Sequence, residues 1–271
     1  MTFFRFNFLA GSVLIGLLSA MSFVSFFWLP HDPNSLNFQV QLQGISRAHW
    51  LGTDEFGRDL FSRLLVGSRN TFYVGFVSVA IGLSIGSSLG LLAGYFRGLL
   101  DETVMRLIDT VYAFPAILMA LLLATVFGPG TFTAILAIGI AIIPMFARIT
   151  RASVLSIKQT TFIEAGRALG AGHIRLLYRY FLPNISSPLI VQATISLSMA
   201  VLAEAALSFL GLGTPPNVPS WGNMLREAQT FLAFSPLPAL VPGIAITITV
   251  FGWSLLGDGI RDIVDPFTRG K

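Results

Sequence analysis

Six long, nearly uninterrupted apolar segments constrain this chain more than any other feature of its sequence. The first, residues 8–29, contains no charged side chain, and a helix of that length spans the roughly 30 Å hydrocarbon core of a bilayer. Backbone N–H and C=O groups meet no water there, so they must be paired within the chain, as they are in a helix. The segments therefore predict an all-α membrane protein with six transmembrane helices.

Composition agrees with this interpretation. The 271 residues are 54% hydrophobic and 11% charged, with a mean hydropathy of +0.76, which is more apolar than soluble domains are. A pI near 9.8 would suggest a nucleic-acid partner in a soluble protein, but in a membrane protein it indicates basic cytoplasmic loops. We expect the lipid bilayer, and no nucleic acid, as a partner.

The first 70 residues divide into a span and a loop. Residues 1–29 are interpreted as the N-terminus and an uncleaved first span, because no convincing cleavage site precedes Pro30. Residues 30–70 are interpreted as an external loop. Within it, the apolar face of a short surface helix that caps the bundle is expected from Leu60, Phe61, Leu64 and Leu65.

The rest of the chain is interpreted as a core of five spans at residues 71–260. These spans are expected at about 71–96, 107–127, 131–147, 187–207 and 237–256, and the span at 107–127 is expected to be kinked or loosened at Pro115. The core includes a cytoplasmic loop at residues 151–186, and a cytoplasmic tail follows at residues 261–271. Six spans place both termini on one side, and assigning that side to the cytoplasm puts most of the 17 Lys and Arg residues inside.

A stripe of small residues marks the second span as central. Gly82, Gly86, Gly90 and Gly94 recur every fourth residue, so they lie along one face of a helix. Such a stripe lets another transmembrane helix approach closely. We therefore expect these four glycines to be helix-packing residues.

A basic amphipathic segment, residues 164–183, interrupts the second half of the chain with the sequence EAGRALGAGHIRLLYRYFLP. Its apolar spacing predicts two short helices, separated by the glycines at 170 and 172 and ended at Leu182-Pro183. The first would carry Ile163, Ala165, Ala168 and Leu169 on one side; the second would carry Ile174, Leu177 and Phe181, with a separate basic row of Arg175 and Arg179. Without further information, the segment could also lie on lipid headgroups.

The same segment resembles the Glu-Ala-Ala loop in membrane subunits of binding-protein-dependent ABC importers. The matching positions are Glu164, Ala165, Gly166, Gly170, Tyr180, Leu182 and Pro183, of which Gly166 replaces the third small residue and Tyr180 replaces an apolar one. The phrases HWLGTDEFGRD and LSFLGLGTPPNVPSWG are similar to those of the dipeptide, oligopeptide and nickel branch. The resemblance covers nearly the whole chain.

This resemblance implies a fold and a function. The fold would be a five-helix type I importer permease core with a cytoplasmic coupling helix, in the bacterial cytoplasmic (inner) membrane. Its partners would be a second homologous permease subunit, two cytoplasmic ATPase subunits and an extracytoplasmic solute-binding protein. Glu164 and Gly170 would couple the chain to the ATPases, with docking area from Leu169 and Leu177. Cargo would be a di- or oligopeptide, or alternatively nickel or a metal chelate.

No residue pattern predicts catalysis by this chain. A phosphate-binding loop is absent, and the only Gly-Lys pair is Gly270-Lys271. ATP and Mg are therefore expected on the partner ATPases, and this chain is expected to be neither an enzyme nor a cofactor protein. With no cysteine, and with His31, His49 and His173 isolated in the sequence, no metal site is expected.

Two acids fall within apolar segments and leave an alternative function open. Asp109 follows Arg106 by three residues, so we expect an ion pair between them near the inner interface. Glu204 lies deeper, where a protonated or hydrogen-bonded structural role competes with direct cargo contact. A secondary transporter would use these acids as an ion relay, but no internal repeat supports it. An intramembrane enzyme is disfavoured because no histidine falls in a span.

Overall fold

The computed structural model describes residues 2–264, and over this range it is built from helices, with one isolated β-bridge between Thr53 and Asp59. The α-helices are α1 Thr2–Val24, α2 Leu60–Phe96, α3 Gly98–Ala113, α4 Ala116–Phe127, α5 Thr131–Ile157, α6 Thr161–Ala168, α7 His173–Leu176, α8 Leu182–Phe209, α9 Trp221–Ala228 and α10 Leu237–Val264. Short 3₁₀ turns occupy Phe38–Val40 and Gln229–Phe231, and a π-helical turn, η2, occupies Leu177–Phe181.

Five helical segments within residues 2–264 are long and apolar enough to cross a membrane, and the bent pair α3–α4 makes a sixth if it counts as one span. The bend between α3 and α4 is 88°, which is a break and not the loosened kink expected at Pro115. Phe114 is extended there (φ −85°, ψ 123°) because a residue that precedes proline avoids the helical region. The predicted all-α membrane fold is confirmed.

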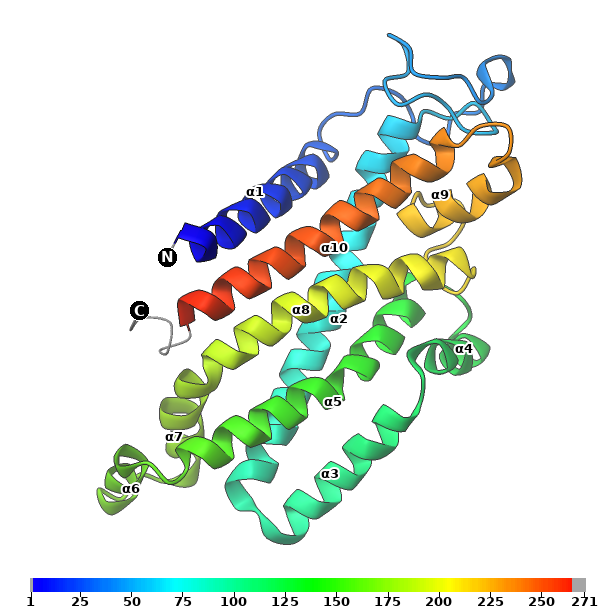
Figure 1. Cartoon of the computed structure of the whole chain (residues 1–271). Helices are drawn as coiled ribbons and strands as arrows, with labels where there is room; N and C mark the ends of the chain where they lie inside the picture. The colour runs from blue at the N-terminus through cyan, green and yellow to red at the C-terminus, as the bar shows by residue number, and fades with distance from the viewer. Residues whose placement is uncertain (1, 265–271) are drawn as a thin grey trace.

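The bundle has two distinct ends (Figure 1). The N-terminal end of α1 and the C-terminal end of α10 lie at the same end as α6, and the loop between α1 and α2 lies at the opposite end, beside α9. We refer to these as the α6 end and the α9 end. Within the predicted tail at residues 261–271, residues 265–271 lie outside the described residues.

The expected short surface helix does not exist as a separate element. Leu60 to Leu65 form the first turns of the 37-residue α2, which begins where the Asp59 side chain accepts a hydrogen bond from the Ser62 N–H (2.8 Å). Leu60 and Leu65 are only 1% and 2% exposed. The prediction was wrong because Trp221 of α9 covers this end of α2, donating its indole N–H to the Leu64 carbonyl (3.1 Å).

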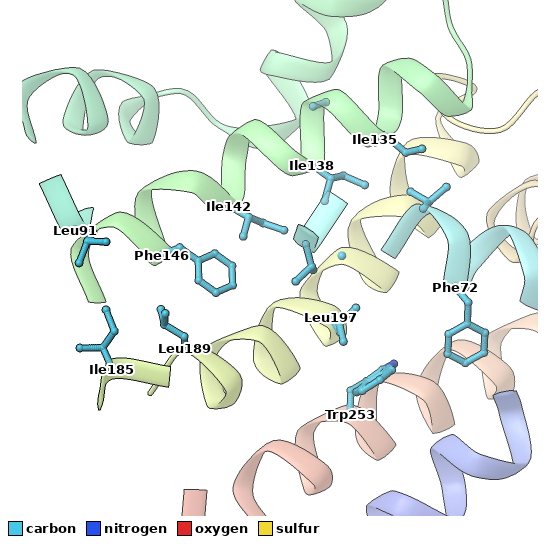
Figure 2. Packing of buried hydrophobic residues seen from close by; sticks show 14 of the residues in the cluster. Phe72, Leu91, Ile135, Ile138, Ile142, Phe146, Ile185, Leu189, Leu197 and Trp253 are labelled. Carbon is cyan, nitrogen blue, oxygen red and sulfur yellow. The ribbon is translucent and has the colours of Figure 1, made fainter. Parts of the chain in front are cut away.

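The core forms where α2, α5 and α8 meet (Figure 2). Ile138, Ile142 and Phe146 of α5 point toward α8, where Leu189 and Leu197 face them. The stripe of glycines on α2 lies against α5: a Cβ on Gly86 would come within 2.8 Å of Phe146 Cβ, and one on Gly82 within 2.9 Å of Ile142. Gly90 and Gly94 approach Thr150 and Val154 in the same way. The missing side chains therefore let two long helices lie in backbone contact.

The helix expected to end at Leu182-Pro183 continues instead into α8. A π-helical turn, η2, precedes the proline, and the Leu182 N–H donates to the Leu177 carbonyl, five residues back. Pro183 then occupies the first turn of α8, where a missing N–H costs little. As a result, a continuous helical segment runs from His173 to Phe209.

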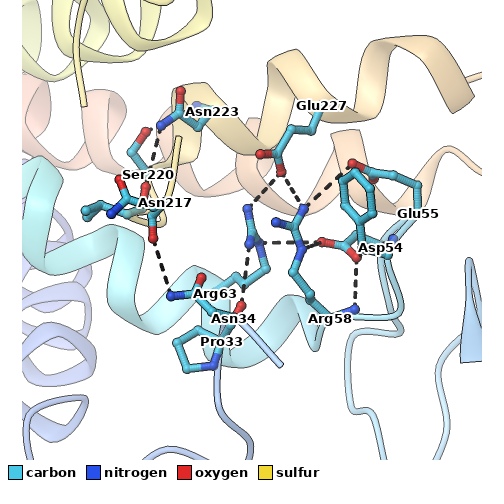
Figure 3. A network of polar contacts seen from close by, with 12 residues as sticks. Pro33, Asn34, Asp54, Glu55, Arg58, Arg63, Asn217, Ser220, Asn223 and Glu227 are labelled. Carbon is cyan, nitrogen blue, oxygen red and sulfur yellow. Dashed lines mark hydrogen bonds and ion pairs between the residues drawn. The ribbon is translucent and has the colours of Figure 1, made fainter. Parts of the chain in front are cut away.

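A buried ionic network joins the α1–α2 loop to α9 at the α9 end (Figure 3). Glu227 Oε2 accepts hydrogen bonds from Arg58 Nη2 (2.7 Å) and Arg63 Nη2 (2.8 Å). Arg58 also donates from Nε to Asp54 Oδ2 (2.6 Å). Burial raises the pKa of the neighbouring Glu55, and the charges of Asp54 and Glu227 add to that effect. The network thereby fixes residues 54–63 against α9.

Candidate functional site: the knob at residues 161–181 and the adjoining groove

Residues 161–181, which we call the knob, consist of α6, a glycine turn, α7 and η2. The turn is a Schellman motif. Gly170 has φ +76°, its N–H donates to the Arg167 carbonyl (2.9 Å), and the Ala171 N–H donates to the Gly166 carbonyl (3.1 Å). Gly170 is required because a side chain disfavours this left-handed conformation.

Gly166 brings the two halves of the knob together. It is buried in α6, and a Cβ there would lie 3.0 Å from Cε1 of Tyr180 and 3.3 Å from Leu176 Cδ2. Tyr180 stacks in turn on Phe162, with ring centroids 6.5 Å apart and planes 15° from parallel. The small residue at 166 therefore makes room for a large one at 180.

Tyr95, near the C-terminal end of α2, anchors the knob to the bundle. Its hydroxyl lies 2.6 Å from His173 Nδ1, and its ring packs edge-on against Phe181 at 5.5 Å. Its backbone carbonyl accepts from Lys158 Nζ (2.5 Å). Burial, with Arg167 and Arg97 nearby, lowers the pKa of Lys158. No sequence pattern predicted this role of Tyr95, because nothing in the α2 sequence signals a contact 78 residues away.

The buried side of the knob differs from the predicted one. Ile163 is fully buried, and Leu176, Leu177 and Phe181 are 2%, 7% and 0% exposed. Ala165 and Ala168 face outward, so the expected grouping of Ile163 with them was wrong. Leu177 cannot supply docking area, because its side chain packs into the core with Phe181.

The outer side of the knob is both apolar and charged. Leu169 is 85% exposed and Ile174 is 75% exposed. The Glu164 side chain is exposed in the first turn of α6, and no hydrogen bond or ion pair to it is found among residues 2–264. Other exposed side chains on this surface are Phe162, Arg167, Arg175, Tyr178 and Arg179. Such a surface has free area and free charge for a partner.

A groove of about 490 Å³ lies between α2 and α8, beginning directly beyond the knob. Leu182, the first residue of α8, lines it, and Pro183 beside it is exposed. The groove is lined by Leu83, Ser84, Ser87, Ser88, Leu182, Ser186, Leu189, Ile190, Ala193, Thr194 and Leu197. It therefore combines an aliphatic wall with several hydroxyl groups, on the same two helices that hold the knob.

Glu204 lies away from this groove in a buried hydrogen-bond network that engages one of its two carboxylate oxygens, Oε1. Its side chain is 0% exposed, and Oε1 accepts hydrogen bonds from Asn70 Nδ2 (3.2 Å), Ser208 Oγ (2.8 Å) and Thr214 Oγ1 (3.2 Å). These groups join α2, α8 and the α8–α9 loop. Glu204 is thus shielded from solvent in this structure, which agrees with the hydrogen-bonded structural role.

Asp109 does not pair with Arg106, as the sequence spacing predicted. Asp109 Oδ1 accepts from Arg148 Nη2 of α5 (2.6 Å), and Arg106 pairs with Glu102 (2.5 Å). The spacing argument failed because the pairing partner lies on a neighbouring helix. A second tether, from Arg151 to Asp101 at 2.6 and 2.7 Å, also joins α5 to α3.

The histidines are not all isolated. His31 and His49 stack with ring centroids 4.7 Å apart, beside Asp59, at the α9 end. Sequence spacing could not reveal this cluster, because the loop folds back on itself between them.

Comparison with known proteins places these features in a family. The family described as "Binding-protein-dependent transport system inner membrane component" matches residues 86–270. The glutathione transport system permease protein GsiD of Pectobacterium atrosepticum is 42% identical over 258 residues, 95% of this chain and 86% of that protein. The dipeptide transport system permease protein DppC of Alkalihalophilus pseudofirmus is 42% identical over 226 residues, covering 83% and 74%.

A third relative and a solved structure agree with these. The probable D,D-dipeptide transport system permease protein DdpC of Escherichia coli is 40% identical over 260 residues, 96% of this chain and 87% of that protein. A chain of the inward-facing MetNI methionine ABC transporter superimposes with a TM-score of 0.62 at 24% identity, covering 74% of this chain and 96% of that one. This likeness confirms the predicted type I importer permease fold.

Proposed function

This chain belongs to the family of binding-protein-dependent transport system inner membrane components, the permeases of ABC importers, and on that premise we propose that it forms half of a pathway for di- and oligopeptides. It is a multi-pass inner-membrane protein. Three relatives at 40–42% identity are named for glutathione, dipeptide or D,D-dipeptide transport, which supports peptide cargo over nickel.

The knob is the observation that carries the proposed coupling. Its outer surface offers the exposed carboxylate of Glu164 and the exposed side chains of Leu169 and Ile174, which fit a partner's cleft that combines cations with apolar area. Two ATPase subunits, which would bind ATP and Mg, would bind this surface of the knob and the corresponding surface of a second homologous permease. ATP hydrolysis would therefore occur on those partners and not on this chain.

Force applied to the knob would reach the groove through short, rigid connections. Tyr95 fixes the knob to α2, and η2 runs into α8 without a break. Both helices line the groove, through Ser88 and Ser186 among others. A displacement of the knob by the ATPases would thus change the separation of the groove walls and move the pathway between inward-open and outward-open states.

This arrangement also sets the proposed orientation. The knob must face the ATPases, so the α6 end, with both termini, would lie in the cytoplasm. The α9 end would then face the extracytoplasmic solute-binding protein that delivers cargo. Most of the 17 Lys and Arg residues would lie on the cytoplasmic side under this assignment, in agreement with the positive-inside rule.

Competitive uptake tests the cargo. The chain would be reconstituted with its partner subunits and binding protein in proteoliposomes that contain ATP, and uptake of a radiolabelled dipeptide would be compared with uptake of ⁶³Ni²⁺ and a nickel chelate. We expect ATP-dependent peptide uptake that an excess of unlabelled oligopeptide competes away. ATP-dependent nickel uptake without peptide uptake would overturn the proposed cargo while retaining the importer.

A further inference from the structure

Two histidines and one carboxylate meet at the α9 end, outside the knob and the groove. His49 Nδ1 lies 2.9 Å from Asp59 Oδ1, and His31 Nδ1 lies 3.8 Å from Asp59 Oδ2. The potential ligand atoms of the three residues all lie within 4.8 Å of one another. We propose that His31, His49 and Asp59 bind a divalent d-block cation, with Zn²⁺ as the best fit.

The distances suit a tetrahedral ion. Zn–N and Zn–O bonds of about 2.0–2.1 Å place the ligand atoms of a tetrahedron roughly 3.3 Å apart. His49 Nδ1 lies 2.9 Å from Asp59 Oδ1, a hydrogen bond that a metal ion would replace, and His31 Nδ1 lies 3.8 Å from the other oxygen of the same carboxylate, Oδ2. The His31 side chain is 41% exposed, so its ring has room to turn toward an ion held by His49 and Asp59. Its exposure also leaves a side open for a water as the fourth ligand.

The chemistry of the donor set selects the metal class. Two imidazoles and one carboxylate suit Zn²⁺, Ni²⁺ and Cu²⁺, whereas Mg²⁺ and Ca²⁺ prefer sites made of oxygen ligands alone. Asp59 is also held in place: its Oδ2 accepts from the Ser62 N–H (2.8 Å) and from Ser62 Oγ (2.7 Å). Such supporting hydrogen bonds fix the orientation of a metal-binding carboxylate.

The bound ion would clamp three separate parts of the chain. His31 follows α1, His49 lies within the α1–α2 loop, and Asp59 is the N-cap of α2. The ring of Trp50 packs between Trp28 (6.0 Å) and Phe61 (5.2 Å) close by, so aromatic side chains shield part of the surroundings. A cation would therefore hold the loop onto the bundle by charge as well as by packing.

Zinc binding by the reconstituted complex tests this proposal. The full chain and its partners would be purified without a polyhistidine tag, stripped with a chelator, placed in lipid nanodiscs and dialysed against Zn²⁺, and the bound metal would be measured by mass spectrometry. His31→Gln removes a ligand with an exposed side chain, so folding should persist. His173→Gln is the matched control, because His173 lies at the other end of the bundle against Tyr95.

We expect the wild type and His173→Gln each to bind one more Zn²⁺ per copy of this chain than His31→Gln binds. The affinity of His31→Gln for Zn²⁺ should be lower by at least about tenfold. Zn²⁺, but not Mg²⁺, should also raise the apparent unfolding temperature of the wild type and of His173→Gln, but not that of His31→Gln. Equal zinc binding by the wild type and His31→Gln would overturn the proposal. The measurement uses neither ATP nor cargo, so it is independent of the proposed function.

Discussion

Gly166 and Tyr180 contact each other across the knob, such that a Cβ at position 166 would lie 3.0 Å from Tyr180 Cε1. These are the two positions at which the loop departs from the importer pattern. The structure explains both departures as one exchange, in which a smaller residue on α6 accommodates a larger one on η2. The pattern of small residues is thus a packing requirement that two positions can satisfy together.

A double-mutant cycle tests this compensation. Gly166→Ala gains helix propensity but presses on the Tyr180 ring, whereas in the Tyr180→Ile background it should meet no such contact. We expect Gly166→Ala to be more favourable in that background by at least about 0.5 kcal/mol. Thermal unfolding of the purified permease measures the four stabilities. Strict additivity would show that the two residues do not compensate each other.

The α2–α5 contact predicts a strong effect at Gly90. A Cβ there would overlap the Ala147 carbonyl oxygen and lie 2.8 Å from Thr150 Cβ, so Gly90→Ala must force the helices apart. We expect a cost of about 1–3 kcal/mol. Gly16→Ala in α1 is the matched control, since nothing lies within 4 Å of its Cβ position. Unfolding temperatures that shift equally in both variants would contradict close packing at the stripe.

Glu227→Ala should destabilise the α9 end. It would remove the acceptor shared by Arg58 and Arg63, and the Arg63 side chain is only 1% exposed. Asp54 still pairs with both arginines, so we expect a loss at the lower end of the about 3–5 kcal/mol that breaking a buried ion pair costs. Glu102→Ala, which removes an exposed pair with Arg106, should cost at most about 1 kcal/mol. Similar losses in the two variants, measured by thermal unfolding, would show that the network contributes no more than a surface pair.

The buried acid Glu55 should make the free energy of unfolding depend on pH through its place at the α9 end. Burial raises its pKa in the folded protein above that in the unfolded chain, so folding favours the protonated acid. The contribution of Glu55 to the free energy of unfolding is therefore fully present below its pKa in the unfolded chain. That contribution is lost as the pH rises through its pKa in the folded protein. Glu55→Gln should be more stable than wild type at neutral pH, and the difference should shrink on acidification. A difference that is constant with pH would contradict this account.

Much of the fold was accessible from the sequence because its signals are local. Apolar length indicated the spans, and a four-residue repeat indicated the face of α2 that packs closely. Several failures involve partners distant in sequence. Leu60 and Leu64 were predicted to lie on a surface helix, but Trp221 packs on them. Asp109 pairs with Arg148 of another helix.

The candidate site likewise has some features that local sequence signals predict and others that depend on contacts between residues distant in sequence. Gly170 was identified correctly as the turn between the two helices, because a left-handed glycine leaves a local signature. The burial of Leu177, the anchoring role of Tyr95 and the meeting of His31 with His49 depend on tertiary contacts that no spacing along the chain encodes. The coupling role assigned to Glu164 and Leu169 stays a prediction.

The coupling ratio of the reconstituted importer tests that role most directly: peptide taken up per ATP hydrolysed, for wild type, Glu164→Ala, Leu169→Ala and Glu102→Ala. Glu102 is the matched control, an exposed acid near the start of α3, which directly follows the end of α2 where Tyr95 anchors the knob. We predict that the ratio falls at least tenfold in the two knob variants while membrane insertion and unfolding temperature are unchanged, and that Glu102→Ala behaves as wild type. Unchanged coupling in both knob variants would contradict the assignment of the knob as the link to the ATPases.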